Sequence, residues 1–203
     1  MEQIKGHEYV DLGLPSGLKW AKCNVGAKTE TDYGDYFMWG SVTPNNDTLC
    51  DWEHAPFNNG SSDYNEEYFT SHKSEWLDDK GNLRPKFDAA TQIMGGKWRI
   101  PTDAEISELW DNTNSEWVED YNGTKINGMK FTSKINGNSI FIPAAGNCLD
   151  GSVHYVGNYG YVWSSSLSPL YHSYAWNLGF GSGSYDVYDC YRYYGFSVRG
   201  VRK

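Results

Sequence analysis

Glycine interrupts this chain at short intervals, and asparagine adds further breaks, so the sequence favours short elements over long helices. The 203 residues include 22 glycines, and most apolar stretches between them are short and alternating. Alternation is typical of strands with one buried face, whereas a helix needs a longer stretch with helical periodicity. We expect an α+β fold in which two short helices pack on mostly antiparallel sheets with long loops.

Size and charge limit the class of protein further. The 203 residues are at the upper edge of one ordinary domain, so we predict a single domain over residues 1–203. A formal net charge of -9 repels phosphate backbones and anionic lipid, which makes nucleic acid and membrane surfaces poor partners. No apolar run is long enough to span a bilayer, and no membrane insertion is predicted.

The N-terminus and the cysteines carry weaker signals. Residues 1–6 lack the basic start and apolar stretch of a signal peptide, which predicts either a cytoplasmic protein or a trimmed start. The four cysteines lack C-x-x-C spacing, so we predict neither a metal site nor a cofactor. The default is four reduced or buried thiols, with a bridge between Cys23 and Cys148 as the alternative.

Two segments carry helix signals. Thr102 and Glu105 form a capping-box pattern that predicts a helix to about Asn112, with Ile106, Leu109 and Trp110 on one face. A second helix is expected from Lys86 to Met94, ended by Gly95 and Gly96, with an apolar face made of Phe87, Ala90, Ile93 and Met94. We expect this helix to pack against the first.

The remaining elements are expected to be strands. The segment from Tyr9 to Trp20 reads as a hairpin. The polar segment from Thr43 to Arg84 is poorly periodic and predicts a long surface insertion rather than a second core. Further short strands are expected at Lys130–Thr132, Ser139–Pro143, Val162–Ser165, Ala175–Phe180 and Phe196–Val201.

The segment from about Leu167 to Tyr194 divides into two interleaved classes of position. The first class is apolar or structural and contains Ala175, Trp176, Leu178, Phe180, Ser182 and Val187. The second class contains Leu170, Tyr171, His172, Ser173, Tyr174, Gly179, Gly181, Gly183, Ser184, Tyr185, Asp186, Tyr188, Asp189, Cys190, Tyr191, Tyr193 and Tyr194. The classes alternate strictly from Leu178 to Gly183, so the second class should face solvent on one side of a strand.

The composition of the second class is typical of a binding surface. Tyr, Ser, Gly and Asp dominate it, whereas Lys, Glu, Gln and Met are absent from Leu167 to Gly195. Rigid tyrosine rings among small residues are the composition of antibody paratopes, while an ordinary solvated face would use Lys and Glu. A tyrosine-rich sheet edge or an irregular loop without a binding role would explain the composition equally well.

The genetic code favours the binding interpretation. Each residue of the second class can be encoded by replacing one or both adenines of an Asn codon while keeping the final pyrimidine. That set of codons excludes Lys, Glu, Gln, Met and Trp, and the segment's one tryptophan, Trp176, belongs to the first class. The pattern is what adenine-directed mutagenesis would produce.

Several blocks resemble the variable proteins of diversity-generating retroelements with a C-type-lectin-like fold, whose framework is related to formylglycine-generating-enzyme-type domains. These blocks occur in the expected order over nearly the whole chain: Tyr9–Trp20, Gly96–Thr102, Ile142–Gly146, Val162–Ser166 and Gly195–Arg202. Such proteins occur in gut bacteria and their phages. The resemblance implies a variable surface that binds a protein or glycan receptor on a target cell, displayed on a virion tail or a cell surface.

A surface that tolerates substitution needs a fixed support below it. We expect Trp163, Trp176, Leu178, Phe180, Val187, Phe196 and Val198 to pack there. Arg192 and Arg199 are expected to be held by carboxylates or carbonyls beneath the surface, while Arg202 is equally consistent with a solvated side chain.

Enzymatic and calcium-dependent functions have little support. A formylglycine-generating oxidase needs a reactive cysteine pair near the C-terminus, where this chain has only Cys190. The calcium-binding motifs of true C-type lectins are absent, and the five histidines show no ligand or triad spacing. We therefore predict no catalytic residue. The alternative functions are a fixed-specificity carbohydrate-binding module or surface adhesin, and a phage tail subunit, which is compatible with the leading prediction.

Overall fold

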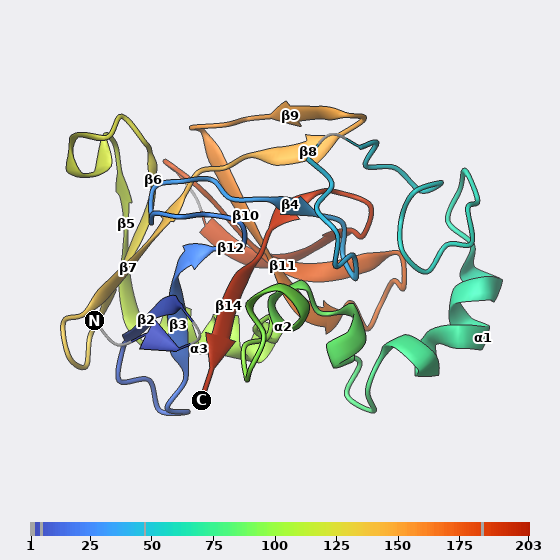
Figure 1. Ribbon diagram of the computed structural model, residues 1–203, viewed down its shortest axis with the longest axis horizontal. Helices are drawn as coiled ribbons and strands as arrows, with labels where there is room; N and C mark the ends of the chain where they lie inside the picture. The colour runs from blue at the N-terminus through green and yellow to red at the C-terminus, as the bar shows by residue number, and fades with distance from the viewer. Residues whose placement is uncertain (1–2, 5, 47, 184) are drawn as a thin grey trace.

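The protein is described by a computed structural model that covers residues 3–4, 6–46, 48–183 and 185–203. Mostly antiparallel sheets with a few short helices make up the chain, which confirms the predicted α+β class (Figure 1). Over the described residues the helices number three rather than the predicted two: α1 (Glu66–Trp76), α2 (Ala89–Met94) and α3 (Asp103–Asp111). Short 3-10 turns occur at Pro85–Phe87 and Tyr121–Gly123.

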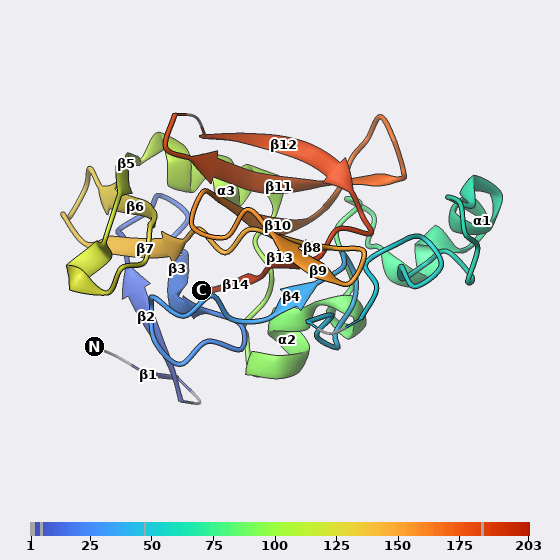
Figure 2. The ribbon, with the colours of Figure 1, turned by 90° about the horizontal axis from the view of Figure 1, so that it is seen from above.

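A five-stranded sheet in the order β12-β11-β10-β13-β4 forms the centre of the molecule. Its strands are β4 (Tyr36–Phe37), β10 (Tyr159–Leu167), β11 (Tyr174–Gly181), β12 (Tyr185–Tyr191) and β13 (Phe196–Ser197). Only the pairing of β10 with β13 is parallel within this sheet as described. The strand β12 lies at the sheet's outer edge (Figure 2).

Three smaller sheets surround the central one. The sheet β1-β2-β3-β14 contains β1 (Gln3–Ile4), β2 (His7–Asp11), β3 (Lys19–Asn24) and β14 (Arg199–Arg202). The sheet β5-β6-β7 contains β5 (Thr113–Val118), β6 (Gly128–Ser133) and β7 (Ser139–Pro143). A separate hairpin joins β8 (Asn147–Leu149) to β9 (Ser152–His154).

The predicted strands are present, with some boundaries moved. Tyr9 pairs with Ala21 and Val10 with Trp20, which confirms the N-terminal hairpin. The expected strand Phe196–Val201 is split into β13 and β14, which belong to different sheets. The strands β5, β8, β9 and β12 were not predicted, because their sequences are polar or tyrosine-rich rather than alternately apolar.

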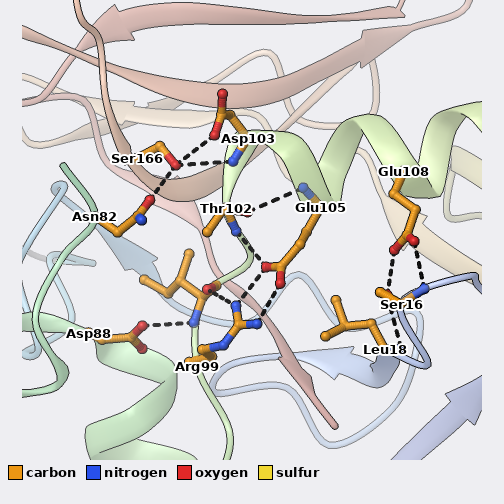
Figure 3. Close-up of polar contacts among 11 residues, drawn as sticks. Ser16, Leu18, Asn82, Asp88, Arg99, Thr102, Asp103, Glu105, Glu108 and Ser166 are labelled. Carbon is orange, nitrogen blue, oxygen red and sulfur yellow. Dashed lines mark hydrogen bonds and ion pairs between the residues drawn. The ribbon is translucent and has the colours of Figure 1, made fainter. Parts of the chain in front are cut away.

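The capping box at the start of α3 forms as predicted. The Thr102 hydroxyl accepts from the Glu105 amide, and the Glu105 carboxylate accepts from the Thr102 amide (Figure 3). Glu105 also takes a bidentate pair from Arg99, at 2.5 and 2.6 Å. Farther along the helix, Glu108 accepts from the amide and hydroxyl of Ser16 in the first hairpin. These bonds fix α3 against the sheet that carries β12.

The second predicted helix is shorter than expected. It begins after Asp88, whose carboxylate caps it by accepting from the Thr91 amide, and the residues before it form a 3-10 turn. Gly95 and Gly96 have positive φ and end it as predicted. Ile93, placed on the buried face by sequence, is exposed. The expected packing of this helix on α3 is wrong in emphasis, because α2 packs chiefly on β14 while α3 packs on β5, β10, β11 and β12.

The segment from Thr43 to Arg84 is only in part the surface insertion that was predicted. It contains α1, which projects at one end of the molecule (Figure 1). It also contributes large buried side chains to the main core, among them Phe57, Phe69 and Trp76. The helix was missed because its residues are mainly polar, with Phe69 and Trp76 as its only buried side chains. The segment builds a wall of the existing core rather than a second one.

The predicted support is buried, with one exception. Trp163, Phe196 and Val198 belong to one apolar cluster, and Leu178 and Phe180 to a second that Val187 packs against. Trp176 is only half-buried and lies in neither cluster, which corrects its placement in the core. It shares a strand face with Leu178 and Phe180, but it sits toward the start of β11, where the core ends.

The cysteines are arranged differently from the alternative considered above. Cys148 and Cys50 lie together in a small buried cluster, whereas Cys23 is half-buried on β3. The Cys23–Cys148 pairing is therefore wrong. None of the described helices is long and apolar enough to cross a membrane.

Candidate binding surface

The residues predicted to vary lie on β11, on the edge strand β12 and in the loops that flank them. The exposed ones are Leu170, Tyr171, Gly183, Tyr185, Asp186, Tyr188 and Tyr191. Those that are half-buried are His172, Ser173, Tyr174, Asp189, Cys190, Tyr193 and Tyr194, and the two that are buried are Gly179 and Gly181. Ser184 lies outside the described residues. The structure thus brings most of these positions to one edge of the central sheet.

The two buried glycines correct the expectation that their strand face meets solvent. Gly179 lies under the ring of Tyr188, and a Cβ built on it would be 2.4 Å from that ring. Gly181 lies under Tyr159 in the same way, at 2.9 Å. The strand alternates as predicted, but tyrosines from the neighbouring strands cover the glycines. The glycines supply the space in which those rings lie flat on the sheet.

A pocket of about 300 Å³ opens on this face of the sheet. Tyr161, Tyr188, Cys190 and Tyr194 line its floor and sides. The β8–β9 hairpin forms the opposite wall with Leu149, His154 and Tyr155. Aromatic rings and hydroxyls therefore dominate a pocket that lies between the predicted variable strand and a hairpin outside it.

Sequence reasoning missed the contribution of Tyr155, Tyr159 and Tyr161. The signal was present, because ten of the sixteen tyrosines lie between Tyr155 and Tyr194. The variable segment was limited to about residues 167–194, and the earlier tyrosines fell outside it. Pairing of Tyr161 with Gly179 and of Tyr159 with Gly181 in neighbouring strands brings them to the same face.

A continuous chain of ring contacts crosses the surface. Each neighbouring pair of rings has its centroids between 3.9 and 6.5 Å apart, within the usual range for aromatic pairs. In order, the rings are those of Tyr171, Tyr174, Tyr191, Tyr193, Tyr194, Phe196, Tyr161, Tyr159 and Tyr155. Such contacts hold the rings in place before any ligand arrives, which lowers the entropy cost of binding.

The ends of the surface rest on other parts of the chain. At one end the Tyr185 ring packs on Trp110 of α3, with centroids 3.9 Å apart. At the other, Trp52 of the insertion contacts both Tyr191 and Tyr193. The insertion and α3 therefore support opposite ends of the edge strand.

His172 ties the loop before β11 to the insertion. Its ring Nδ1 lies 2.8 Å from the Glu66 carboxylate at the start of α1, and its ring contacts Phe69. Partial burial opposes ionisation of Glu66, but hydrogen bonds with His172, Thr70 and Tyr64 outweigh it and lower the pKa of the carboxyl. His172 thus acts as a local anchor as well as a surface residue.

Arg192 is buried directly behind this loop and is held as predicted. Its guanidinium donates to the carbonyls of His172, at 2.7 Å, and of Pro56, at 3.2 Å. Phe69 lies 4.4 Å from the guanidinium carbon, and three further rings surround it at 5.5 to 5.8 Å: Tyr64, Trp52 and Trp39. Burial lowers the pKa of Arg192 to about 10. One side chain therefore joins the variable loop to the insertion.

The other two arginines differ from each other. Arg199 is completely buried and donates to carbonyls of Ala21, Lys22 and Phe141 and to the Asn24 side chain, which confirms the expected support by carbonyls. Arg202 is half-buried, donates to the Lys203 carbonyl and stacks near Trp98. Arg199 thus fixes the end of the chain against β3 and β7.

The tyrosine hydroxyls are neutral donors and acceptors at ordinary pH. A hydrogen bond with Tyr191, helped by burial, raises the pKa of Tyr174 to about 12. Burial raises the pKa of Tyr193 to about 12 and that of Tyr188 as well. Burial also raises the pKa of the Cys190 thiol to about 11, so a reactive thiolate is disfavoured in the pocket.

Comparison with known proteins adds no assignment to this geometry. No protein-family model, curated protein or solved structure matches the chain. Among the residues that the structure describes, no three His, Cys, Asp or Glu side chains lie together in a way that could hold a metal ion. The chemistry of the surface is thus that of aromatic rings, hydroxyls and a few carboxylates.

Proposed function

We propose that this chain is a hypervariable ligand- or receptor-binding protein with a C-type-lectin-like fold, diversified by a retroelement. Its partner is a protein or glycan receptor on a target cell, and it is displayed on a virion tail or a cell surface. The observation that carries the proposal is the separation of the two classes of position. Most residues of the adenine-mutagenesis set gather at one sheet edge, while Leu178 and Phe180 of the other class are buried beneath it.

Binding would depend mainly on the exposed tyrosines. Tyr171, Tyr185, Tyr188 and Tyr191 each retain more than a third of their surface exposed, from 37% to 59%. Each can bury a ring against a partner and offer one hydroxyl hydrogen bond, which is the combination found at interface hot spots. Since Asp186 and Asp189 are the only ionisable carboxylates of the set, contacts would be mostly neutral.

The geometry also ranks the positions. Leu170 is 79% exposed and contacts little, so it can change freely. His172 and Asp189 have side-chain partners, Glu66 and Ser168, that a substitution would lose. We expect diversity to be greatest at the exposed positions and smaller at these two.

The gene's neighbourhood tests the proposal. A retroelement would place a reverse transcriptase nearby, together with a near-copy of the segment that carries Asn codons at the variable positions. Sequencing the flanking DNA should reveal both. If neither is present in flanks of several gene lengths, diversification by a retroelement is excluded.

A fixed-specificity carbohydrate-binding module is the second candidate, and the pocket favours it. Rings with hydroxyls beside them, as provided by Tyr161, Tyr188 and Tyr194, suit stacking on a sugar face with hydrogen bonds at its rim. A glycan array probed with the wild-type protein and with Tyr188→Ala tests this function. Binding to one sugar class that Tyr188→Ala removes, while Leu170→Ala leaves it unchanged, would favour the module.

A further inference from the structure

Two cysteines from distant parts of the chain are buried side by side. Cys50 belongs to the insertion and Cys148 to β8, and both have no exposed surface. Their sulfurs approach the same two carbonyl oxygens: that of Asn45, at 3.9 Å and 3.4 Å, and that of Thr48, at 3.9 Å and 4.0 Å. The two thiols also form a hydrogen bond with each other.

Gly195 shows how closely the two side chains approach. A Cβ built on this glycine would lie 2.8 Å from the Cβ of Cys148 and 2.9 Å from the sulfur of Cys50. Both atoms therefore occupy the space above one residue, which must lack a side chain. Gly195 is in turn held to Cys148 by two backbone hydrogen bonds, of 2.8 and 2.9 Å. The backbone thus fixes one cysteine, and packing places the other against it.

We propose that Cys50 and Cys148 form a disulfide bond when the chain folds in an oxidising compartment. The bond forms by two thiol–disulfide exchanges with a small external disulfide, such as oxidised glutathione. One cysteine thiolate attacks that disulfide and releases one small thiol. The second cysteine then attacks the mixed disulfide and releases the other, so the two cysteines lose two electrons and the external disulfide gains them.

Burial determines when this exchange occurs. Burial, and the hydrogen bond with Cys148, raise the pKa of the Cys50 thiol, so the folded state holds it protonated and unreactive. The exchange therefore takes place during folding, before the cluster closes around it. Cys23 and Cys190 are half-buried and far less enclosed, and each lacks a facing thiol among the described residues.

The bond would lock two walls of the tyrosine surface together. Cys50 is two residues before Trp52, which contacts Tyr191 and Tyr193. Cys148 lies between Asn147 and Leu149, which line the pocket. A bridge between them would fix the insertion and the β8–β9 hairpin on either side of Tyr193. This consequence rests on the proposed binding function, whereas the bond itself does not.

Refolding in a redox buffer tests the bond. The full-length double variant Cys23→Ser/Cys190→Ser keeps only the two thiols in question. Refolded with reduced and oxidised glutathione, it should weigh two hydrogen masses less than after treatment with dithiothreitol. Protease mapping should join the peptides that contain Cys50 and Cys148, and the Tm should rise by roughly 5–10 °C.

The control is Cys50→Ala/Cys148→Ala, whose Tm should be the same in both buffers. Wild-type protein, mapped in parallel, should give the same joined peptide, so the test does not depend on either variant folding. Retention of both thiols, glutathione adducts at these positions, or a bridge to Cys23 or Cys190 in the wild type would overturn the proposal. None of these readings involves ligand binding, so they remain valid whether or not the proposed function holds.

Discussion

Glycine positions in this protein have different roles that only their surroundings reveal. Gly160 lies against the buried ring of Phe180, with a built Cβ 2.1 Å from it. Gly179 lies under the partly exposed ring of Tyr188, and Gly183 has no atom within 4 Å of its Cβ position. In the sequence, the last two belong to one alternating set and look equivalent. The structure separates a core glycine, a glycine that seats a surface ring and a free loop glycine.

Alanine substitution should separate the same three roles. Gly160→Ala should destabilise the fold by about 1–3 kcal/mol, because Phe180 cannot move without disturbing the core. Gly179→Ala should cost far less, since Tyr188 can turn toward solvent, but its hydroxyl should then titrate closer to the ordinary tyrosine pKa. Gly183→Ala should leave both quantities unchanged. Urea unfolding and absorbance-monitored pH titration measure them, and equal losses for all three variants would contradict this division.

At the scale of elements, the capping box and the first hairpin could be predicted because their signals are local. Thr102 and Glu105 are three residues apart, and the hairpin is a single strand–turn–strand segment. The strand β12 and the helix α1 could not, because tertiary contacts determine them. Tyr185 finds Trp110 of α3, and Phe69 finds Arg192, and neither partner is near in sequence. The pocket was missed for the same reason, since one wall comes from the β8–β9 hairpin.

Phe69 should control how the insertion supports the surface. Its ring is fully buried between α1, His172 and Arg192. Phe69→Ala should destabilise the protein by about 3–5 kcal/mol and free the loop that holds His172. The matched substitution Tyr68→Ala, at a partly buried ring of the same helix, should cost less. Hydrogen exchange should then show faster exchange in residues 168–173 for Phe69→Ala only, and unchanged exchange there would contradict the role of α1.

The ion pair at the start of α3 should make stability depend on pH in acid. Burial opposes ionisation of Glu105, but hydrogen bonds from Arg99 and Thr102 outweigh it and lower the pKa of the carboxyl from its usual value of 4.5. A lowered pKa adds stability that is present above the unfolded-state pKa and is lost as the pH falls through the folded-state value. Glu105→Gln should therefore remove part of the stability at neutral pH and flatten its decline below 4.5. Urea midpoints measured from pH 7 to 3 check this, and parallel curves for both proteins would contradict it.

At the scale of the whole molecule, the sheet edge and the core are separate in composition and in position. The edge carries Tyr, Asp and small residues, while the side chains behind it are apolar and buried. Exposed substitutions usually change stability by less than about 0.5 kcal/mol each, whereas core truncations cost several times more. The fold can therefore tolerate change at the edge, provided that the support stays fixed.

Combined substitution should show this tolerance. A variant with Leu170→His, Tyr171→Ser, Tyr185→Ser and Asp186→Tyr draws each new residue from the same codon set. Its Tm should fall by only a few degrees, because three of the four side chains are surface groups and only Tyr185 gives up a ring contact. Leu178→Ala alone should cost about 2–5 kcal/mol and lower the Tm further. A quadruple variant less stable than Leu178→Ala would contradict the account.

The central claim is tested most directly by deep sequencing of this gene across a natural population, tallied position by position from Val153 to Lys203. Our account predicts that substitutions concentrate at the exposed positions Leu170, Tyr171, Tyr185, Asp186, Tyr188 and Tyr191. Leu178, Phe180 and Val187 should stay fixed over the same sample. Substitutions spread evenly over both groups would contradict a diversified binding surface and leave the fixed-specificity module as the better account.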